Sequence, residues 1–126
     1  MLTSYLHRQA GQRFAWGRSD CATFIADWVA LLTGIDAAAH VRGTYTDAGS
    51  AELHFARFGG LARAVGSAMR RAGFRMTQTP IAGDVAVVRF GPILACAIWT
   101  GARWVYRGDR GLVLSSHGRA VAIWRI

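Results

Sequence analysis

The sequence contains no lysine, and among its 126 residues only seven are acidic, two are prolines and two are cysteines. So few cysteines exclude a small fold held together by disulfides, and we expect both thiols to be reduced. No apolar run approaches the roughly 20 residues of a membrane-spanning helix. The N-terminal residues also lack the charged-then-apolar pattern of a signal peptide, so no export by that route is expected.

Arginine supplies the positive charge, and the formal net charge is +8. Residues 1–63 hold six arginines and five acids, a net charge of +1, whereas residues 64–126 hold nine arginines and two acids, a net charge of +7. This asymmetry suits an acidic protein partner, an anionic cell-wall polymer or a nucleic acid. No helix-turn-helix, RNP-like strand or zinc-finger spacing accompanies the charge, so nucleic-acid binding ranks third among the functions considered.

Hydrophobic periodicity divides the chain into a helical first half and a β second half. Helices are predicted over residues 2–12, 21–33, 48–58 and 61–72, and strands over 85–90, 93–100, 103–107, 112–115 and 120–125. Helices followed by an antiparallel meander indicate an α+β fold. We expect one domain over residues 1–126, with the helix of residues 21–33 packed on a sheet of four or five strands.

The run from Trp16 to Cys21 leads directly into a strong apolar helical pattern that ends at Gly34. Either Ser19 or Asp20 is a suitable N-cap, which places Cys21 in the first helical turn. Unpaired backbone N–H groups and the helix dipole favour a thiolate at this position. Cys21 is therefore a candidate nucleophile, with a structural thiol in the core as the alternative.

This order of parts resembles the NlpC-like branch of the papain-fold peptidases: a cysteine opening a buried helix, further helices, then Gly83-Asp84-Val85 and a strand ending at Thr100-Gly101. The resemblance covers residues 14–34 and 83–107 and implies a papain-like fold. Members of that family cut peptidoglycan stem peptides, and many are carried in phage tails and prophages. Over most of the chain the sequence is also similar to small phage and prophage proteins, through Trp16-Gly17, Asp20-Cys21, the segment Arg42–Tyr45, Ala122, Trp124 and Arg125.

In the peptidase family a histidine on the strand after Gly-Asp is the general base. The Thr100-Gly101 turn sets the alignment and places Ala95 at the position of that histidine. The family's third polar residue corresponds to Val105 or Tyr106, and neither is a usual partner. Alternation along the strand points Cys96 away from the face of Ala95, so we do not expect Cys96 to replace the base. The resemblance thus implies a scaffold that has lost the group needed to protonate the leaving amine.

His117, between the last two strands, is the candidate for a displaced base, with an ordinary turn histidine as the alternative. His7, His40 and His54 are expected on the surface, and Asp84 is expected to cap its strand. No group has metal-ligand spacing, so neither a metal nor another cofactor is expected. Substrate or partner contacts are expected from Trp16, Arg18, Asp20, Trp99, Trp104 and Tyr106, with packing within the sheet as the alternative for its aromatic residues.

Three functions follow from these patterns. The first is a phage or prophage tail-tip or tail-assembly component, built on a peptidoglycan-peptidase scaffold without catalytic activity. It would contact other tail proteins, first in the bacterial cytoplasm during assembly and then in the virion. The alternative is an active cysteine peptidase or amidase that cleaves peptidoglycan stem peptides with Cys21 as nucleophile and His117 as base. The third is a basic nucleic-acid-binding module.

Overall fold

The computed structural model describes residues 1–126, which form four helices followed by a six-stranded antiparallel sheet. The helices are α1 (Leu2–Ala10), α2 (Cys21–Thr33), α3 (Ala48–Ala56) and α4 (Leu61–Arg71). The strands are β1 (Arg75–Thr77), β2 (Val85–Phe90), β3 (Ile93–Trp99), β4 (Trp104–Gly108), β5 (Gly111–Ser115) and β6 (Arg119–Arg125). The predicted α+β class is confirmed. No helix combines the length and the apolar character needed to cross a membrane.

The expected number of strands was wrong, because β1 was not predicted. Its three residues show no apolar alternation, and two of them, Arg75 and Met76, are exposed. β1 exists because it pairs with the last strand of the chain, where Met76 lies opposite Trp124. A strand created by a partner about 50 residues away leaves no local signal.

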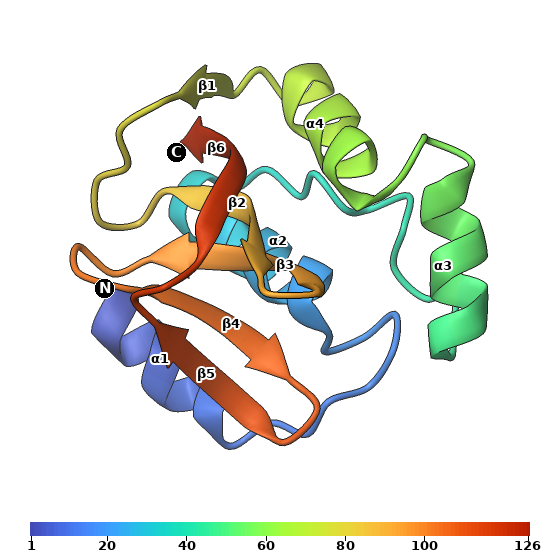
Figure 1. Cartoon of the computed structure of the whole chain (residues 1–126), viewed down its shortest axis with the longest axis horizontal. Helices are drawn as coiled ribbons and strands as arrows, with labels where there is room; N and C mark the ends of the chain where they lie inside the picture. Colours follow the sequence, from blue (N-terminus) through green and yellow to red (C-terminus); the bar gives the residue numbers. More distant parts are fainter.

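The strands lie in the order β1-β6-β2-β3-β4-β5. β2 to β5 follow one another as a meander, and β6 then returns across the sheet to pair with β2 (Figure 1). The register between β2 and β6 shifts between Val87 and Val88, which marks an irregularity in the ladder. The arrangement leaves β1 and β5 as the two edges of the sheet.

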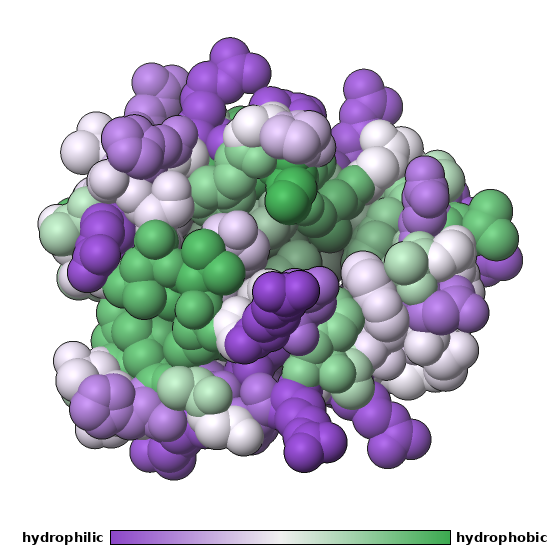
Figure 2. Space-filling model, turned by 60° about the horizontal axis from the view of Figure 1, so that its bottom comes forward, coloured by the Kyte–Doolittle hydropathy of each residue, from purple (hydrophilic) through white to green (hydrophobic).

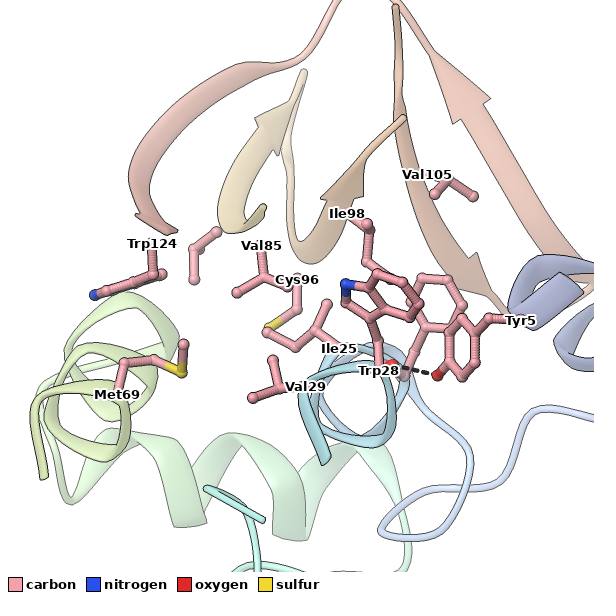
Figure 3. Packing of buried hydrophobic residues seen from close by; sticks show 12 residues of the cluster. Tyr5, Ile25, Trp28, Val29, Met69, Val85, Cys96, Ile98, Val105 and Trp124 are labelled. Carbon is pink, nitrogen blue, oxygen red and sulfur yellow. Dashed lines mark hydrogen bonds between the residues drawn. The ribbon is translucent and has the colours of Figure 1, made fainter. Parts of the chain in front are cut away.

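Three of the four helices cover one face of the sheet, and α3 packs on α4. α2 packs on β3 and β4, α4 packs on β6 and β2, and α1 contacts β5. The main core lies between these layers (Figure 3) and consists of Tyr5, Phe24, Ile25, Trp28, Val29, Met69, Val85, Val87, Cys96, Ile98, Val105 and Trp124. The opposite face carries a smaller cluster of Ala86, Val88, Ala97, Trp104 and Ile123. Both faces of the central strands are therefore buried.

Arg107 of β4 is a buried cation, only 1% exposed. Its guanidinium donates to the Gln12 carbonyl oxygen over 3.0 Å and to the Gln9 side chain, and lies 5.5 Å from the centre of the Phe24 ring. No carboxylate forms an ion pair with it, and its Nε has no hydrogen-bond partner. Burial lowers the pKa of Arg107. This side chain fastens the end of α1 to the sheet.

Candidate functional site

α2 begins as its sequence predicted, with Asp20 as the N-cap. The Asp20 carboxylate accepts from the Thr23 N–H over 2.9 Å, and the Thr23 hydroxyl oxygen accepts from the Asp20 N–H over 2.9 Å. This reciprocal capping box satisfies two backbone donors at the start of the helix. Gly34, in the left-handed conformation with φ of 79°, ends the helix at the expected residue. Cys21 thus occupies the first helical position.

Asp20 does more than cap the helix, because its carboxylate also accepts from the Gly17 N–H over 2.9 Å and from the Tyr45 hydroxyl over 2.8 Å. We call this set of contacts among Asp20, Gly17, Thr23 and Tyr45 the Asp20 junction. Asp20 is 1% exposed and receives only neutral donors. The expectation that Asp20 contacts a substrate or partner was therefore wrong, because its carboxylate oxygens are occupied by hydrogen bonds within the fold. Burial, followed by the nearby Asp20 charge, raises the pKa of Tyr45.

The Asp20 junction also explains why Gly17 and the segment Arg42–Tyr45 occur together. The Gly43 N–H donates to the Gly17 carbonyl oxygen over 3.0 Å. Gly17 has a φ of +79°, and a Cβ there would overlap the carbonyl oxygen of Tyr45. Only glycine combines this conformation with such a close approach. The turn with Gly17 and the segment Arg42–Tyr45 are thus held together at the N-terminal end of α2.

Cys21 faces the second cysteine of the chain. Cys96 on β3 is fully buried and points towards α2 (Figure 3), whereas Cys21 is half-buried. The neighbouring Cys96 thiol lowers the pKa of Cys21, whereas burial and the Asp20 charge oppose this effect. The same contact, together with burial, raises the pKa of Cys96. Cys21 is the thiol of the pair that ionises first.

The sequence placed Ala95 opposite Cys21, and this assignment was wrong. Cys96 and Ile98 belong to the core between the sheet and the helices, whereas Ala97 belongs to the cluster on the other face. Strand alternation puts Ala95 with Ala97. Cys96 and Ile98 point to the same face of β3, as predicted. That face, and not the face of Ala95, meets α2. The side chain opposite Cys21 is therefore a thiol.

The structure does not bring His117 to Cys21. His117 lies exposed in the connection between β5 and β6, where its backbone N–H donates to the Ser115 hydroxyl over 3.2 Å. The next residue, Gly118, packs against Val88 and Phe90, which belong to the sheet face turned away from α2. The candidate pair of nucleophile and displaced base is thus separated by the sheet.

His54 is not the surface residue that the sequence predicted. Its Nε2 is buried without a hydrogen-bond partner, and burial lowers its pKa. The His54 ring lies 5.6 Å from the ring of Tyr45, so it packs against the outer member of the Asp20 junction. It borders a small apolar hollow of about 50 Å³ among α2, α3 and α4, lined by Ala22, Ile25, Ala26, Val29, Ala37, Ala38, His40, Val41, Phe55, Phe58, Ala64, Val65, Ala68 and Met69. No contact links His54 to Cys21.

The other expected contact residues divide into two groups. Trp16 and Arg18 are exposed in the turn before α2, where the Trp16 ring lies 4.8 Å from Phe14. Trp104 is only 5% exposed and packs 4.9 Å from Trp99, so for Trp104 the structure shows the alternative, packing within the sheet, and not a contact surface. Trp99 and Tyr106 are half-buried on the same face. Trp16 and Arg18 remain the candidates for contact with a partner near Cys21.

Asp84 forms a second buried junction at the start of β2. Its carboxylate accepts from the Ile81 N–H and from the Arg125 Nε, each over 2.9 Å, and from the Ile126 N–H over 3.4 Å. We call these contacts the Asp84 junction. On the adjacent residue, the Gly83 carbonyl oxygen accepts from the Trp28 Nε1 over 2.8 Å. The C-terminal motif residues Trp124, in the core, and Arg125 are thus structural as well.

No three histidine, cysteine or acidic side chains are grouped so that they could hold a metal ion. Residues 1–126 match one protein family, described as a domain of unknown function (DUF6950). Neither the curated proteins nor the solved structures contain a match to the chain.

Proposed function

The chain belongs to the DUF6950 family, and we propose that it is a tail-tip or tail-assembly component of a phage or prophage. In this proposal the protein is built on a papain-like, NlpC-type cell-wall peptidase scaffold and has lost peptidase activity. It meets acidic neighbours in the tail through its arginine-rich surface. The proposal combines the sequence resemblance with the chemistry around Cys21.

The loss of activity is supported by one observation: Cys96 is the side chain that faces Cys21. Cleavage of a peptide by a thiol needs a group that orients or accepts the thiol proton and then protonates the leaving amine. An imidazole does both near neutral pH, whereas a buried thiol with a raised pKa does neither. Acid–base catalysis is worth about 10²–10⁴-fold in rate, so its absence removes useful turnover.

The scaffold part of the proposal is supported by the position of the motif residues. Cys21 opens a helix that packs on an antiparallel sheet, and Gly83-Asp84 opens the strand beside β3. The order of helices before strands also agrees with the resemblance. These features are the ones expected of a papain-like arrangement, with the imidazole missing.

The acidic character of the proposed partner is supported by how the chain uses its own carboxylates. Asp20 and Asp84 are buried, and Asp27 and Asp36 both pair with Arg42. Arg42 and Arg125 are the only arginines in ion pairs. The remaining surface arginines have no internal counter-charge, so the surface field is positive and attracts acidic partners.

Two experiments test the proposal. Purified peptidoglycan is incubated with the protein and with Cys21→Ala, and the release of new amino termini is measured; we expect no difference between the two. Cleavage that depends on Cys21 would overturn the loss of activity and establish the enzyme instead. Separately, particles purified from a bacterium that carries the gene should contain the chain in their tails. Its absence from assembled tails would overturn the proposed role in the virion.

A further inference from the structure

The two edges of the sheet differ in how they are protected. β1, at one edge, has three residues and begins with the exposed Arg75. β5, at the other edge, has five residues with the sequence Gly-Leu-Val-Leu-Ser and carries no charge. Natural sheets usually blunt their edges with short strands, charges or prolines, because an open edge pairs with other strands. β1 follows this rule and β5 does not.

The side chains of β5 make this edge apolar as well as open. Val113 is 38% exposed and Leu114 is 46% exposed, whereas Leu112 packs against the main core. Figure 2, in which the lower part of Figure 1 comes forward, shows a continuous apolar area on this side of the molecule, bordered by hydrophilic residues. An exposed apolar area of this kind marks a site of protein contact.

The backbone of β5 is ready to form hydrogen bonds. β5 pairs only with β4, in a ladder that starts at the turn between Gly108 and Gly111 and continues through Tyr106 opposite Val113. Hydrogen-bonded and non-hydrogen-bonded pairs alternate along such a ladder. Val113 therefore bonds to β4, and the N–H and C=O groups of Leu112 and Leu114 point away from the sheet. No other element of the chain takes these four groups.

We propose that β5 pairs with β5 of a second copy of the chain, antiparallel and around a two-fold axis at Val113. This register places Leu112 of each copy opposite Leu114 of the other, so that the four outward groups of each strand find partners. It brings the turn with Asp109 and Arg110 of one copy beside the turn with His117 of the other. The two sheets join into one, and the exposed parts of Val113 and Leu114 become covered.

A second copy fits this edge because the strand is complementary to itself in hydrogen bonding and in apolar surface. The opposing force is the net charge of +8 on each copy. Repulsion between like charges is screened by salt, so dimerisation strengthens as the ionic strength rises. The inference is independent of the proposed function, because it uses neither Cys21 nor any resemblance.

Sedimentation equilibrium of the full chain over a range of protein concentrations tests the dimer. At about 1 M salt, where the Debye length is about 3 Å, the mass should rise with concentration from 13.7 kDa towards twice that value. Leu114→Pro removes only an outward N–H, which a sheet edge tolerates, and should hold the mass at 13.7 kDa. Circular dichroism checks that this variant is folded. The control Met76→Ala, on the opposite edge, should dimerise like the unchanged chain.

A cross-link tests the register. Residues on the two-fold axis in a non-hydrogen-bonded pair lie about 4.5 Å apart between Cα atoms, within disulfide range. Val113→Cys, in a chain with Cys21→Ser and Cys96→Ser, should form a covalent dimer on mild oxidation by oxidised glutathione, whereas Met76→Cys in the same background should not. A wild-type mass that stays at 13.7 kDa at every concentration overturns the proposal. A dimer that Leu114→Pro leaves unchanged also overturns the proposal. So does a β5 edge that binds an added acidic peptide but not a second copy of the chain.

Discussion

The two buried aspartates, Asp20 and Asp84, are 1% and 2% exposed but are held by opposite chemistry. The Asp20 junction uses neutral donors, from backbone N–H groups and the hydroxyls of Tyr45 and Thr23. The Asp84 junction includes the guanidinium of Arg125, which is 43% exposed. One carboxylate is sealed inside the protein, and the other is half of an ion pair that reaches the solvent. Both aspartates belong to the motifs that resemble an enzyme family, yet both hold separate segments of the fold together.

Replacing Asp20 should have the largest effect of the changes considered. Asp20→Ala removes the cap of α2 and leaves the Gly17 N–H and the Tyr45 hydroxyl without their acceptor. A lost cap costs about 1 kcal/mol, and each buried donor left unpaired costs about 1–3 kcal/mol. We expect the free energy of unfolding, measured in urea, to fall by about 3 kcal/mol or more.

α3 provides a matched control for this change. Its N-cap Asp47 has the same capping box with Ser50, but it is exposed and accepts from no distant residue. Asp47→Ala should therefore destabilise the protein much less than Asp20→Ala. Equal losses in the two variants would show that Asp20 acts only as a helix cap.

Asp84→Ala should cost somewhat less, about 2 kcal/mol, because the exposed part of Arg125 recovers water when its partner is lost. The distinguishing measurement is the salt dependence. The coupling energy between Asp84 and Arg125, from a double-mutant cycle with Arg125→Ala, should shrink as salt is added. The coupling between Asp20 and Tyr45, measured with Tyr45→Phe, should not. The same salt response in both cycles would remove the contrast between the junctions.

Gly17→Ala breaks the Asp20 junction from the backbone side while keeping the carboxylate. The added Cβ meets the Tyr45 carbonyl oxygen at a residue with φ of +79°. Strain of this kind costs about 1–3 kcal/mol, and we expect a loss of about 2 kcal/mol in thermal or urea unfolding. Gly34→Ala has the same φ with open space around the Cβ and serves as the control for backbone strain alone. Similar losses for both would mean that the approach of Tyr45 adds nothing.

The smallest expected effect is a change in the reactivity of Cys21. Cys96→Ala removes the donor that lowers the pKa of Cys21, so a smaller fraction of Cys21 is thiolate at pH 7. Alkylation by iodoacetamide should slow severalfold, because the thiolate and not the thiol is the nucleophile. Cys96→Ser keeps a donor and should react nearly as fast as the unchanged protein. Mass spectrometry should find the label on Cys21 and not on Cys96 until the protein unfolds.

The parts of the fold with strong local signals were predictable. The bounds of α2 follow from Asp20, the spacing of apolar residues and Gly34, and β2 follows from Gly83-Asp84 and four consecutive apolar residues. β1 was missed because pairing with β6 creates it. The partnership of Asp20 with Tyr45 joins residues 25 positions apart, which no local pattern encodes.

The direction in which the Cys96 side chain points was predicted wrongly for a different reason. Val85, Ala86, Val87 and Val88 of β2 are all 0% exposed, and Ala95 to Ile98 of β3 are also buried. When both faces of a strand are apolar, its sequence does not reveal which face meets a helix. The resemblance to the family motif therefore determined which residue was predicted to face Cys21, and it indicated Ala95 instead of Cys96. For Trp104 the sequence left both contact with a partner and packing within the sheet open, and the structure shows the packing, against Trp99 on the face without a helix.

The burial of Arg107 affects where local unfolding of the molecule begins. Its guanidinium is enclosed when α1 docks, and the Gln9 side chain and the Gln12 carbonyl oxygen replace only part of its hydration. Detachment of α1 returns water to this ion, which offsets part of the packing lost around Tyr5. The amide hydrogens of α1 should therefore exchange with solvent earlier than those of α2, so that local opening starts at the N-terminal helix.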